Sequence, residues 1–195
     1  MQAISPPNAE VTALILCGGR GSRMGGRDKP LLGWRGARMV DHVVQRARAQ
    51  AGHVLISANR NEGAYAELAE VVTDAPLESR SPLTGIARGM QVAATEWIWV
   101  CPGDTPELAE DLLARLWHAR GEAAVVTAHD GTRNQWLHML ARRSLLANLL
   151  SYLEAGNRSA HGWLAQLPEA SRETARCDEI SNSFLNVNAP DQLNP

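Results

Sequence analysis

The sequence predicts an α/β protein: one mostly parallel sheet with helices on both of its faces, in a single domain over residues 11–195. Two observations predict this class. Short apolar runs alternate along the 195-residue chain with longer segments whose apolar residues recur at helical spacing, and such alternation is typical of parallel sheets. The first apolar run also ends in glycines, as a buried parallel strand should. Residues 1–10 are expected to form a disordered tail.

The first half of the chain alternates strand and helix signals. Residues 11–17 are an apolar run, which predicts a buried strand, and residues 39–50 carry apolar side chains at helical spacing. The same patterns continue, with strands expected at residues 53–58, 71–73 and 97–101 and helices at residues 64–70 and 83–94. In open parallel sheets, ligands bind outside the carboxyl ends of the strands. The glycines after residue 17, Asp74 and Asp104 all fall at such ends.

The second half of the chain continues the alternation with shorter elements. Pro106 suits the first turn of a helix, where its missing N–H leaves no bond unmade, and a helix is expected over residues 107–120. Ser144 is expected to cap a helix that Gly156 ends. The other elements expected here are a helix at residues 159–166 and strands at residues 123–128, 135–141 and 174–180.

Composition excludes several classes of function. The net charge of −2 favours neither a nucleic-acid nor a membrane partner. No window approaches the roughly 18 unbroken apolar residues of a membrane-spanning helix, and the first ten residues lack the pattern of a signal peptide. The three cysteines are far apart and form no C-x-x-C pair, which fits a reducing cytoplasm.

Residues 17–30, CGGRGSRMGGRDKP, combine glycines with positive charge directly after the first strand. Glycine lets backbone N–H groups approach phosphate oxygens closely, and Arg and Lys supply charge. The segment contains Gly18, Gly19, Gly21, Gly25 and Gly26 together with Arg20, Arg23, Arg27 and Lys29. It therefore predicts a loop that wraps a polyphosphate, and the alternative is a surface loop with incidental charge.

Two familiar phosphate-binding motifs do not describe this loop. A P-loop needs Gly-Lys-Ser/Thr at its end, whereas Gly26 is followed by Arg27 and Asp28. A dinucleotide fingerprint needs a third glycine where Met24 stands.

Aspartates follow two of the expected strands. Asp104 comes after the apolar run WIWVC, and one carboxylate with water and phosphate oxygens is enough to hold Mg²⁺. The alternative role of Asp104 is a helix N-cap. Asp74 follows the third strand, where it suits either the N–H edge of a nucleobase, a ribose or a simple turn. No Ser/His/Asp set stands out, which is consistent with phosphoryl or nucleotidyl transfer because these reactions need little proton chemistry.

Six segments of the chain occur in the order of a known set of motifs. They are LCGG at residues 16–19, RMGGRDK at 23–29, SANR at 57–60, PLTG at 82–85, CPGDTP at 101–106 and NVNAP at 186–190. Together they resemble the molybdenum cofactor guanylyltransferase family, a branch of the GT-A-like nucleotidyltransferases, over most of the chain. The segment RMGGRDK is the most specific of them.

The resemblance implies an enzyme that transfers GMP from GTP to the terminal phosphate of molybdopterin, uses Mg²⁺ and releases pyrophosphate. It implies that Lys29 binds phosphate, that Asp74 binds the guanosine and that Asp104 holds Mg²⁺. Lys29 and Arg23 are expected to offset the charge that builds on the phosphates. Transient contacts with other molybdenum cofactor biosynthesis proteins and with acceptor enzymes are also implied.

Further residues border the two substrates in this resemblance. On the nucleotide side they are Leu16, Cys17, Gly18 and Gly19, the first three through their backbone. Ser57 stands where the family usually has a nucleotide-contacting asparagine, and its shorter hydroxyl loses that contact or makes it through water, with Asn59 able to compensate. Asn186 and Asn188 are expected on the molybdopterin side, or alternatively as turn residues.

Two other functions remain open from the sequence. One is a related enzyme that uses CTP, since the cytidylyl branch shares the glycine-rich loop. The other is a nucleotide-binding adaptor without catalysis, which the serine at position 57 favours. A sugar-1-phosphate nucleotidyltransferase is less consistent with the chain, because no appended sugar-binding domain is visible.

Overall fold

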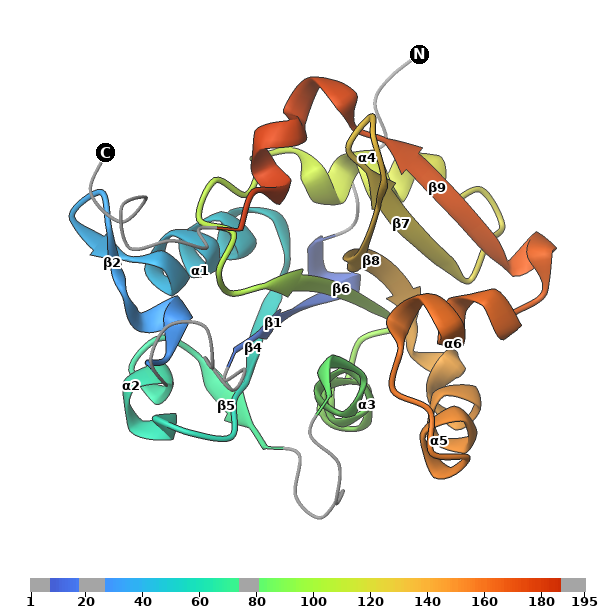
Figure 1. The fold of residues 1–195 in the computed structure, drawn as a ribbon, viewed down its shortest axis with the longest axis horizontal. Coiled ribbons are helices and arrows are strands. Elements are labelled where there is room, and N and C mark those ends of the chain that lie inside the picture. The colour runs from blue at the N-terminus through green and yellow to red at the C-terminus, as the bar shows by residue number, and fades with distance from the viewer. Residues whose placement is uncertain (1–7, 18–26, 74–80, 187–195) are drawn as a thin grey trace.

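The computed structural model describes residues 8–17, 27–73 and 81–186. Its centre is a sheet of seven strands in the order β5-β4-β1-β6-β8-β7-β9. The strands are β1 (Val11–Leu16), β4 (His53–Ser57), β5 (Glu70–Val72), β6 (Trp97–Pro102), β7 (Val125–His129), β8 (Asn134–Arg142) and β9 (Arg172–Arg176). All neighbours run parallel except β8, which is antiparallel to both β6 and β7. The mostly parallel sheet predicted from the sequence is thus confirmed (Figure 1).

Helices cover both faces of this sheet. The α1 helix (Met39–Gln50) and α4 (Leu112–Ala119) pack against one face, whereas α3 (Pro82–Val92), α5 (Leu146–Glu154) and α6 (Ala160–Gln166) cover the other (Figure 1). The central strand β1 contributes side chains to both hydrophobic cores. Ala13 and Ile15 belong to the core under α1, and Leu14 belongs to the core under α3. Its burial on both sides explains why the strand is almost entirely apolar.

Side chains define where two of these helices begin. Ser81 and Thr84 form a reciprocal capping box at the start of α3, in which Ser81 Oγ accepts from the Thr84 N–H at 3.4 Å. Ser159 caps α6 by accepting from the Gly162 N–H at 3.2 Å. In the described part of the chain, no helix combines the length and apolarity that a membrane crossing requires.

The structure corrects the predicted helix over residues 107–120. The α4 helix begins only at Leu112. The side-chain amide of Gln50 in α1 binds backbone groups on both sides of this start. Gln50 Nε2 donates to the Ala109 carbonyl at 2.9 Å, and Gln50 Oε1 accepts from the Leu113 N–H at 3.0 Å. A partner on another helix, rather than the local sequence, sets this boundary.

Other predicted boundaries also move. The helix expected at residues 64–70 is α2 (Glu62–Ala66), because Glu70 already pairs with Leu55 as the start of β5. The helix expected from Ser144 is preceded by a 3₁₀ turn and starts at Leu146. The last strand lies earlier than expected and is followed by the 3₁₀ segment η6 (Asp178–Phe184).

The sequence analysis missed a small antiparallel hairpin. Strands β2 (Gly33–Trp34) and β3 (Ala37–Arg38) pair with each other outside the main sheet. The turn between them places Arg35 at φ 45° and Gly36 at φ 86°, the left-handed region that glycine adopts without strain. The glycine at position 36 was the signal for this turn.

Candidate active site

The carboxyl end of β1 is fixed between its two neighbours. Leu16 pairs with Pro102 of β6 and its carbonyl accepts from the Gly103 N–H at 2.9 Å, while the Cys17 N–H donates to the Ser57 carbonyl of β4 at 2.8 Å. The ends of three parallel strands therefore meet at one edge of the sheet, where the glycine-rich loop leaves β1. This is the edge at which a ligand is expected.

A lysine and an aspartate face each other at this edge. Lys29 Nζ lies 2.6 Å from Asp104 Oδ2, with the two side chains 14% and 22% exposed. Lys29 opens the 3₁₀ turn η3 (Lys29–Leu31) after the loop, and it is the only lysine in the chain. Asp104 follows β6 and does not cap α4, whose N-cap is Asp111, so the alternative role raised for Asp104 is wrong. Opposite charges that still reach solvent suit a phosphate on one side and a cation on the other.

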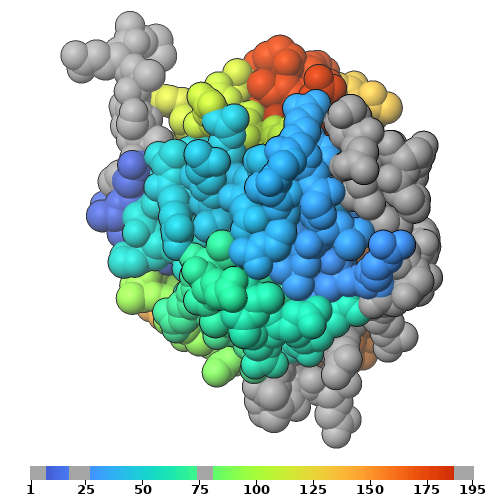
Figure 2. All heavy atoms as spheres, turned by 90° about the vertical axis from the view of Figure 1, so that its left-hand side faces the viewer, coloured from blue at the N-terminus to red at the C-terminus, as the bar shows by residue number. Residues whose placement is uncertain are grey.

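A cluster behind Lys29 was missed by the sequence analysis. Asp28 Oδ2 accepts from Asn61 Nδ2 at 2.9 Å and lies 3.3 Å from Arg60 Nε. Arg60 also donates from Nη2 to the Arg27 carbonyl at 2.8 Å. The loop exit is thus tied to the segment between β4 and α2. In the space-filling view, the blue part of the chain that follows the loop lies next to the blue-green part around α2 (Figure 2). The motif SANR pointed to Arg60, but the sequence did not show that this arginine binds Asp28 and the Arg27 carbonyl.

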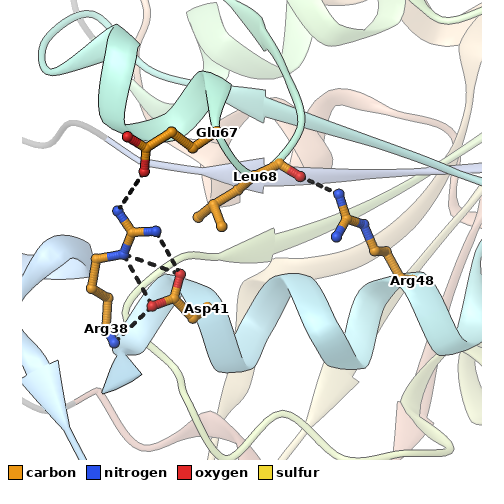
Figure 3. A network of polar contacts seen from close by, with 5 residues as sticks. All are labelled: Arg38, Asp41, Arg48, Glu67 and Leu68. Atoms are coloured by element: carbon orange, nitrogen blue, oxygen red, sulfur yellow. Dashed lines mark hydrogen bonds and ion pairs between the residues drawn. The ribbon is translucent and has the colours of Figure 1, made fainter. Parts of the chain in front are cut away.

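The α2 helix is itself held to α1. Arg38 binds Asp41 through Nε and Nη2 at 3.0 to 3.1 Å and reaches Glu67 Oε2 from Nη1 at 3.5 Å. Arg48, farther along α1, donates to the Leu68 carbonyl (Figure 3). These contacts join both ends of α1 to the segment after α2. They hold α2 in place, and the residues that bind the loop exit lie directly before this helix.

The thiol at the end of β1 is not a nucleophile in this setting. Burial raises the pKa of the Cys17 thiol well above its ordinary value, and the negative charges of Asp28 and Asp104 add to the effect. Burial likewise raises the pKa of Tyr65, with Cys17 and Asp28 contributing. Because the thiolate is the reactive form of cysteine, Cys17 fits a backbone role rather than covalent chemistry.

Two glycines allow close packing at this edge. A Cβ on Gly103 would lie 2.5 Å from Cys17 Sγ and 3.2 Å from the Leu16 carbonyl oxygen. A Cβ on Gly85 would overlap the hydroxyl of Ser57. Ser57 is buried, and its hydroxyl faces α3 at a position where only glycine fits.

The predicted site residues fall into three groups. The structure brings Leu16, Cys17, Lys29, Ser57 and Asp104 together at the carboxyl edge. Asn59 is half-buried just beyond β4, and Asn186 is exposed two residues after Phe184, which packs edge-on against His138 of β8 with ring centroids 5.0 Å apart. The remaining predictions lie outside the described residues: Gly18, Gly19, Arg23, Asp74 and Asn188.

The site contains no all-protein metal cage within residues 8–17, 27–73 and 81–186, where no three His, Cys, Asp or Glu side chains gather to hold an ion. Asp104 offers an accessible carboxylate at this edge. That donor fits Mg²⁺, which commonly binds through one or two carboxylates and completes its shell with water and substrate phosphates.

Comparison with known proteins places this site in context. The family model of the MobA-like NTP transferase domain matches residues 13–171. The molybdenum cofactor guanylyltransferase of Shewanella sp. (strain MR-4) is 37% identical over 186 residues, covering 94% of this chain and 93% of that protein. The protein of the same name from Vibrio parahaemolyticus is 33% identical over 181 residues, covering 92% and 91%.

Solved structures share the fold at lower identity. Molybdopterin-guanine dinucleotide biosynthesis protein A from Archaeoglobus fulgidus superposes with a TM-score of 0.73 at 20% identity, covering 93% of this chain and 94% of that one. A nucleotidyl transferase from Methanothermobacter superposes with a TM-score of 0.75, also at 20% identity, over 94% of both chains. At such identities the superpositions establish the shared fold.

Proposed function

The chain belongs to the family of molybdenum cofactor guanylyltransferases, which carry the MobA-like NTP transferase domain, and from this we propose that it transfers GMP from GTP to the terminal phosphate of molybdopterin. The observation that carries the proposal is the pair of Lys29 and Asp104, 2.6 Å apart at the carboxyl edge of β1 and β6. A cation for phosphate and a carboxylate for Mg²⁺ are the two charges that nucleotidyl transfer requires.

The chemical step is an in-line displacement at the α-phosphorus of GTP. An oxygen of the terminal phosphate of molybdopterin forms the new P–O bond while the bond to the bridging oxygen breaks and pyrophosphate leaves. Lys29, with Arg23 from the loop, offsets the negative charge that builds on the phosphates. The loop backbone and the end of β1 hold the triphosphate in line, so that no protein nucleophile is needed.

Asp104 is the residue that would hold Mg²⁺. When bound, the ion neutralises phosphate oxygens and orients the pyrophosphate for departure. Lys29 would then pair with phosphate instead of with this carboxylate, and both groups already lie at the same edge.

The remaining contacts belong to the two ends of the product. On the nucleotide side, the proposal places the guanosine against Asp74, with Ser57 and Asn59 nearby. Asn186 and Asn188 border the pterin. The three cysteines are free, and Cys101 and Cys177 are buried, which supports a cytoplasmic setting for the reaction.

The proposal is tested by pyrophosphate release from MgGTP and molybdopterin. Asp104→Ala is expected to lower the rate by about 100-fold or more, the usual effect of removing a group that stabilises transition-state charge. The matched control is Asp111→Ala, which removes an exposed carboxylate paired with Arg115 at 2.8 Å and should retain the wild-type rate. Full activity in Asp104→Ala would contradict the metal assignment. Tight GTP binding without turnover in wild type would instead indicate a nucleotide-binding adaptor.

A further inference from the structure

The residue before Lys29 carries a buried negative charge that the proposed reaction does not use. The side chain of Asp28 is only 3% exposed, although the residue lies directly between the glycine-rich loop and the phosphate-binding lysine. A buried carboxylate is costly unless it is paired and hydrogen-bonded. Its presence at this point therefore indicates a specific task.

Two partners of the Asp28 carboxylate belong to the turn after β4. Arg60 approaches the carboxylate from Nε at 3.3 Å and donates from Nη2 to the Arg27 carbonyl, so that one guanidinium holds both a side chain and the backbone before it. Asn61 adds a hydrogen bond of 2.9 Å to the same carboxylate oxygen. The loop exit is anchored at two consecutive residues.

Asn61 adopts a conformation that this anchor explains. It has φ 50° and ψ 33° at the N-cap of α2, yet its side chain makes no cap hydrogen bond. Left-handed backbone is uncommon for residues other than glycine, although asparagine adopts it more readily than most. The amide is directed to Asp28 instead, and α2 is held in place by the Arg38 and Arg48 contacts to Glu67 and Leu68 (Figure 3).

The backbone of Asp28 continues this anchoring into the turn that carries Lys29. The Asp28 carbonyl accepts from the Leu31 N–H at 3.0 Å and starts η3. Asp28 is held by its carboxylate on one side and by its carbonyl on the other, and this fixes the backbone from which the Lys29 side chain extends. The lysine points at Asp104.

We propose that Asp28 is a positioning residue, which uses Arg60 and Asn61 to hold Lys29 opposite Asp104 and which acts on catalysis only through that lysine. This assignment rests on the proposed guanylyl transfer. A reacting group displaced by about 1 Å can lose on the order of 100-fold in rate. The partly buried ion pair of Asp28 with Arg60 would prevent such a displacement of Lys29.

The kinetic test is a double-mutant cycle on pyrophosphate release. Asp28→Asn is expected to lower kcat by about 10- to 100-fold while the KM for GTP changes by less than about 3-fold. In the Lys29→Ala background, the same substitution should cost less than about 2-fold, because the group through which Asp28 acts is already gone. Equal losses in both backgrounds would overturn the proposal. The matched control Asp111→Asn should leave kcat unchanged.

A spectroscopic test does not depend on turnover. Because Lys29 is the only lysine, protein labelled with lysine that carries ¹³C at Cε alone gives a single lysine ¹³Cε signal in an NMR spectrum. In the ligand-free state, Asp28→Asn should shift this signal toward its position in Asp104→Ala, in which the lysine has lost that partner. An unchanged signal would overturn the positioning role, whereas a wild-type protein that fails to transfer GMP would overturn only the proposed function.

A second variant tests the proposal in case Asp28→Asn fails to fold. Asn61→Gly removes the hydrogen bond to Asp28 but suits the left-handed backbone at this position, so the protein is expected to fold. It should move kcat and the lysine signal in the same direction as Asp28→Asn, by a smaller amount. Wild-type values for both measurements would contradict the proposal.

Discussion

At the scale of single residues, the two groups that we propose to bind phosphate and Mg²⁺, Lys29 and Asp104, are paired with each other. Their ion pair of 2.6 Å satisfies both charges as long as no nucleotide is present. Without this pair, the ammonium group and the carboxylate would each be a partly buried charge without a partner of opposite sign. In the proposed reaction, a substrate that brings both phosphate and a divalent cation would replace both halves of the pair at once, whereas either ligand alone would leave one charge without its partner.

His138 provides a residue-scale prediction about pH. It is buried on β8 against Phe184, and burial lowers its pKa from 6.5 to about 3. The unfolded chain therefore binds a proton below pH 6.5 that the folded chain refuses, so the free energy of unfolding should fall as pH decreases from 6.5 toward 3. One such group contributes a slope of about 1 kcal/mol per pH unit.

Urea denaturation at neutral pH and at about pH 5 measures this slope. His138→Leu should reduce the pH dependence, because it removes the proton-binding difference. The exposed His53 supplies the control, since His53→Gln should keep the wild-type slope. An unchanged slope in His138→Leu would show that other groups cause the dependence.

At the scale of elements, the sequence predicted most of the fold. Each segment that was assigned to a strand overlaps one of the seven strands of the main sheet. Buried parallel strands such as β1 and β6 are marked by continuous apolar residues, whereas β9 is largely exposed and carries no such run. The start of α4 was not predictable in the same way, since the amide of Gln50 determines it from another helix. The hairpin of β2 and β3 was too short to produce a periodic signal.

The junction of β6 with Asp104 gives an element-scale prediction. Gly103→Ala should destabilise the protein by about 1 to 3 kcal/mol, the usual range for overpacking, because the new methyl group would lie 2.5 Å from Cys17 Sγ. It should also lower transferase activity by displacing Asp104. Chemical denaturation and pyrophosphate release measure the two effects.

The control for this substitution is another glycine with open surroundings. A methyl group on Gly63, within α2, would have no neighbouring atom within 4 Å, so Gly63→Ala should be neutral or stabilise by up to about 1 kcal/mol. If Gly103→Ala behaves like Gly63→Ala, the close approach of β6 to β1 has no energetic importance.

At the scale of the whole molecule, topology limited what the sequence could predict. The pattern predicted parallel strands, but not that β8 would insert between β6 and β7 in the opposite direction, since strand order depends on how the connections pack. The candidate site likewise contains residues that the sequence predicted and contacts that it did not. Lys29 and Asp104 were predicted from motifs at strand ends, whereas the contact of Arg60 with the Arg27 carbonyl and the neighbouring Asp28 joins segments more than 30 residues apart and became visible only in three dimensions.

Ligand binding should stabilise the molecule as a whole. At a GTP concentration of about 100 times its Kd, with Mg²⁺, binding adds about 2.7 kcal/mol to the free energy of unfolding, which corresponds to a rise in Tm of about 5 to 10 °C for a protein of this size. Differential scanning fluorimetry measures the shift. The same concentration of CTP should produce a clearly smaller shift, and a larger one would favour the cytidylyl alternative.

The position of β1 also has a consequence for how the chain is made. This first strand lies between β4 and β6, so one of its two rows of backbone hydrogen bonds has no partner until the ribosome has synthesised Trp97–Pro102. Domains generally fold as units during synthesis, and sheets whose partners are distant in sequence form slowly. A nascent chain that stalls before β6 is therefore expected to expose an open strand edge, whose unpaired backbone groups can pair with another chain.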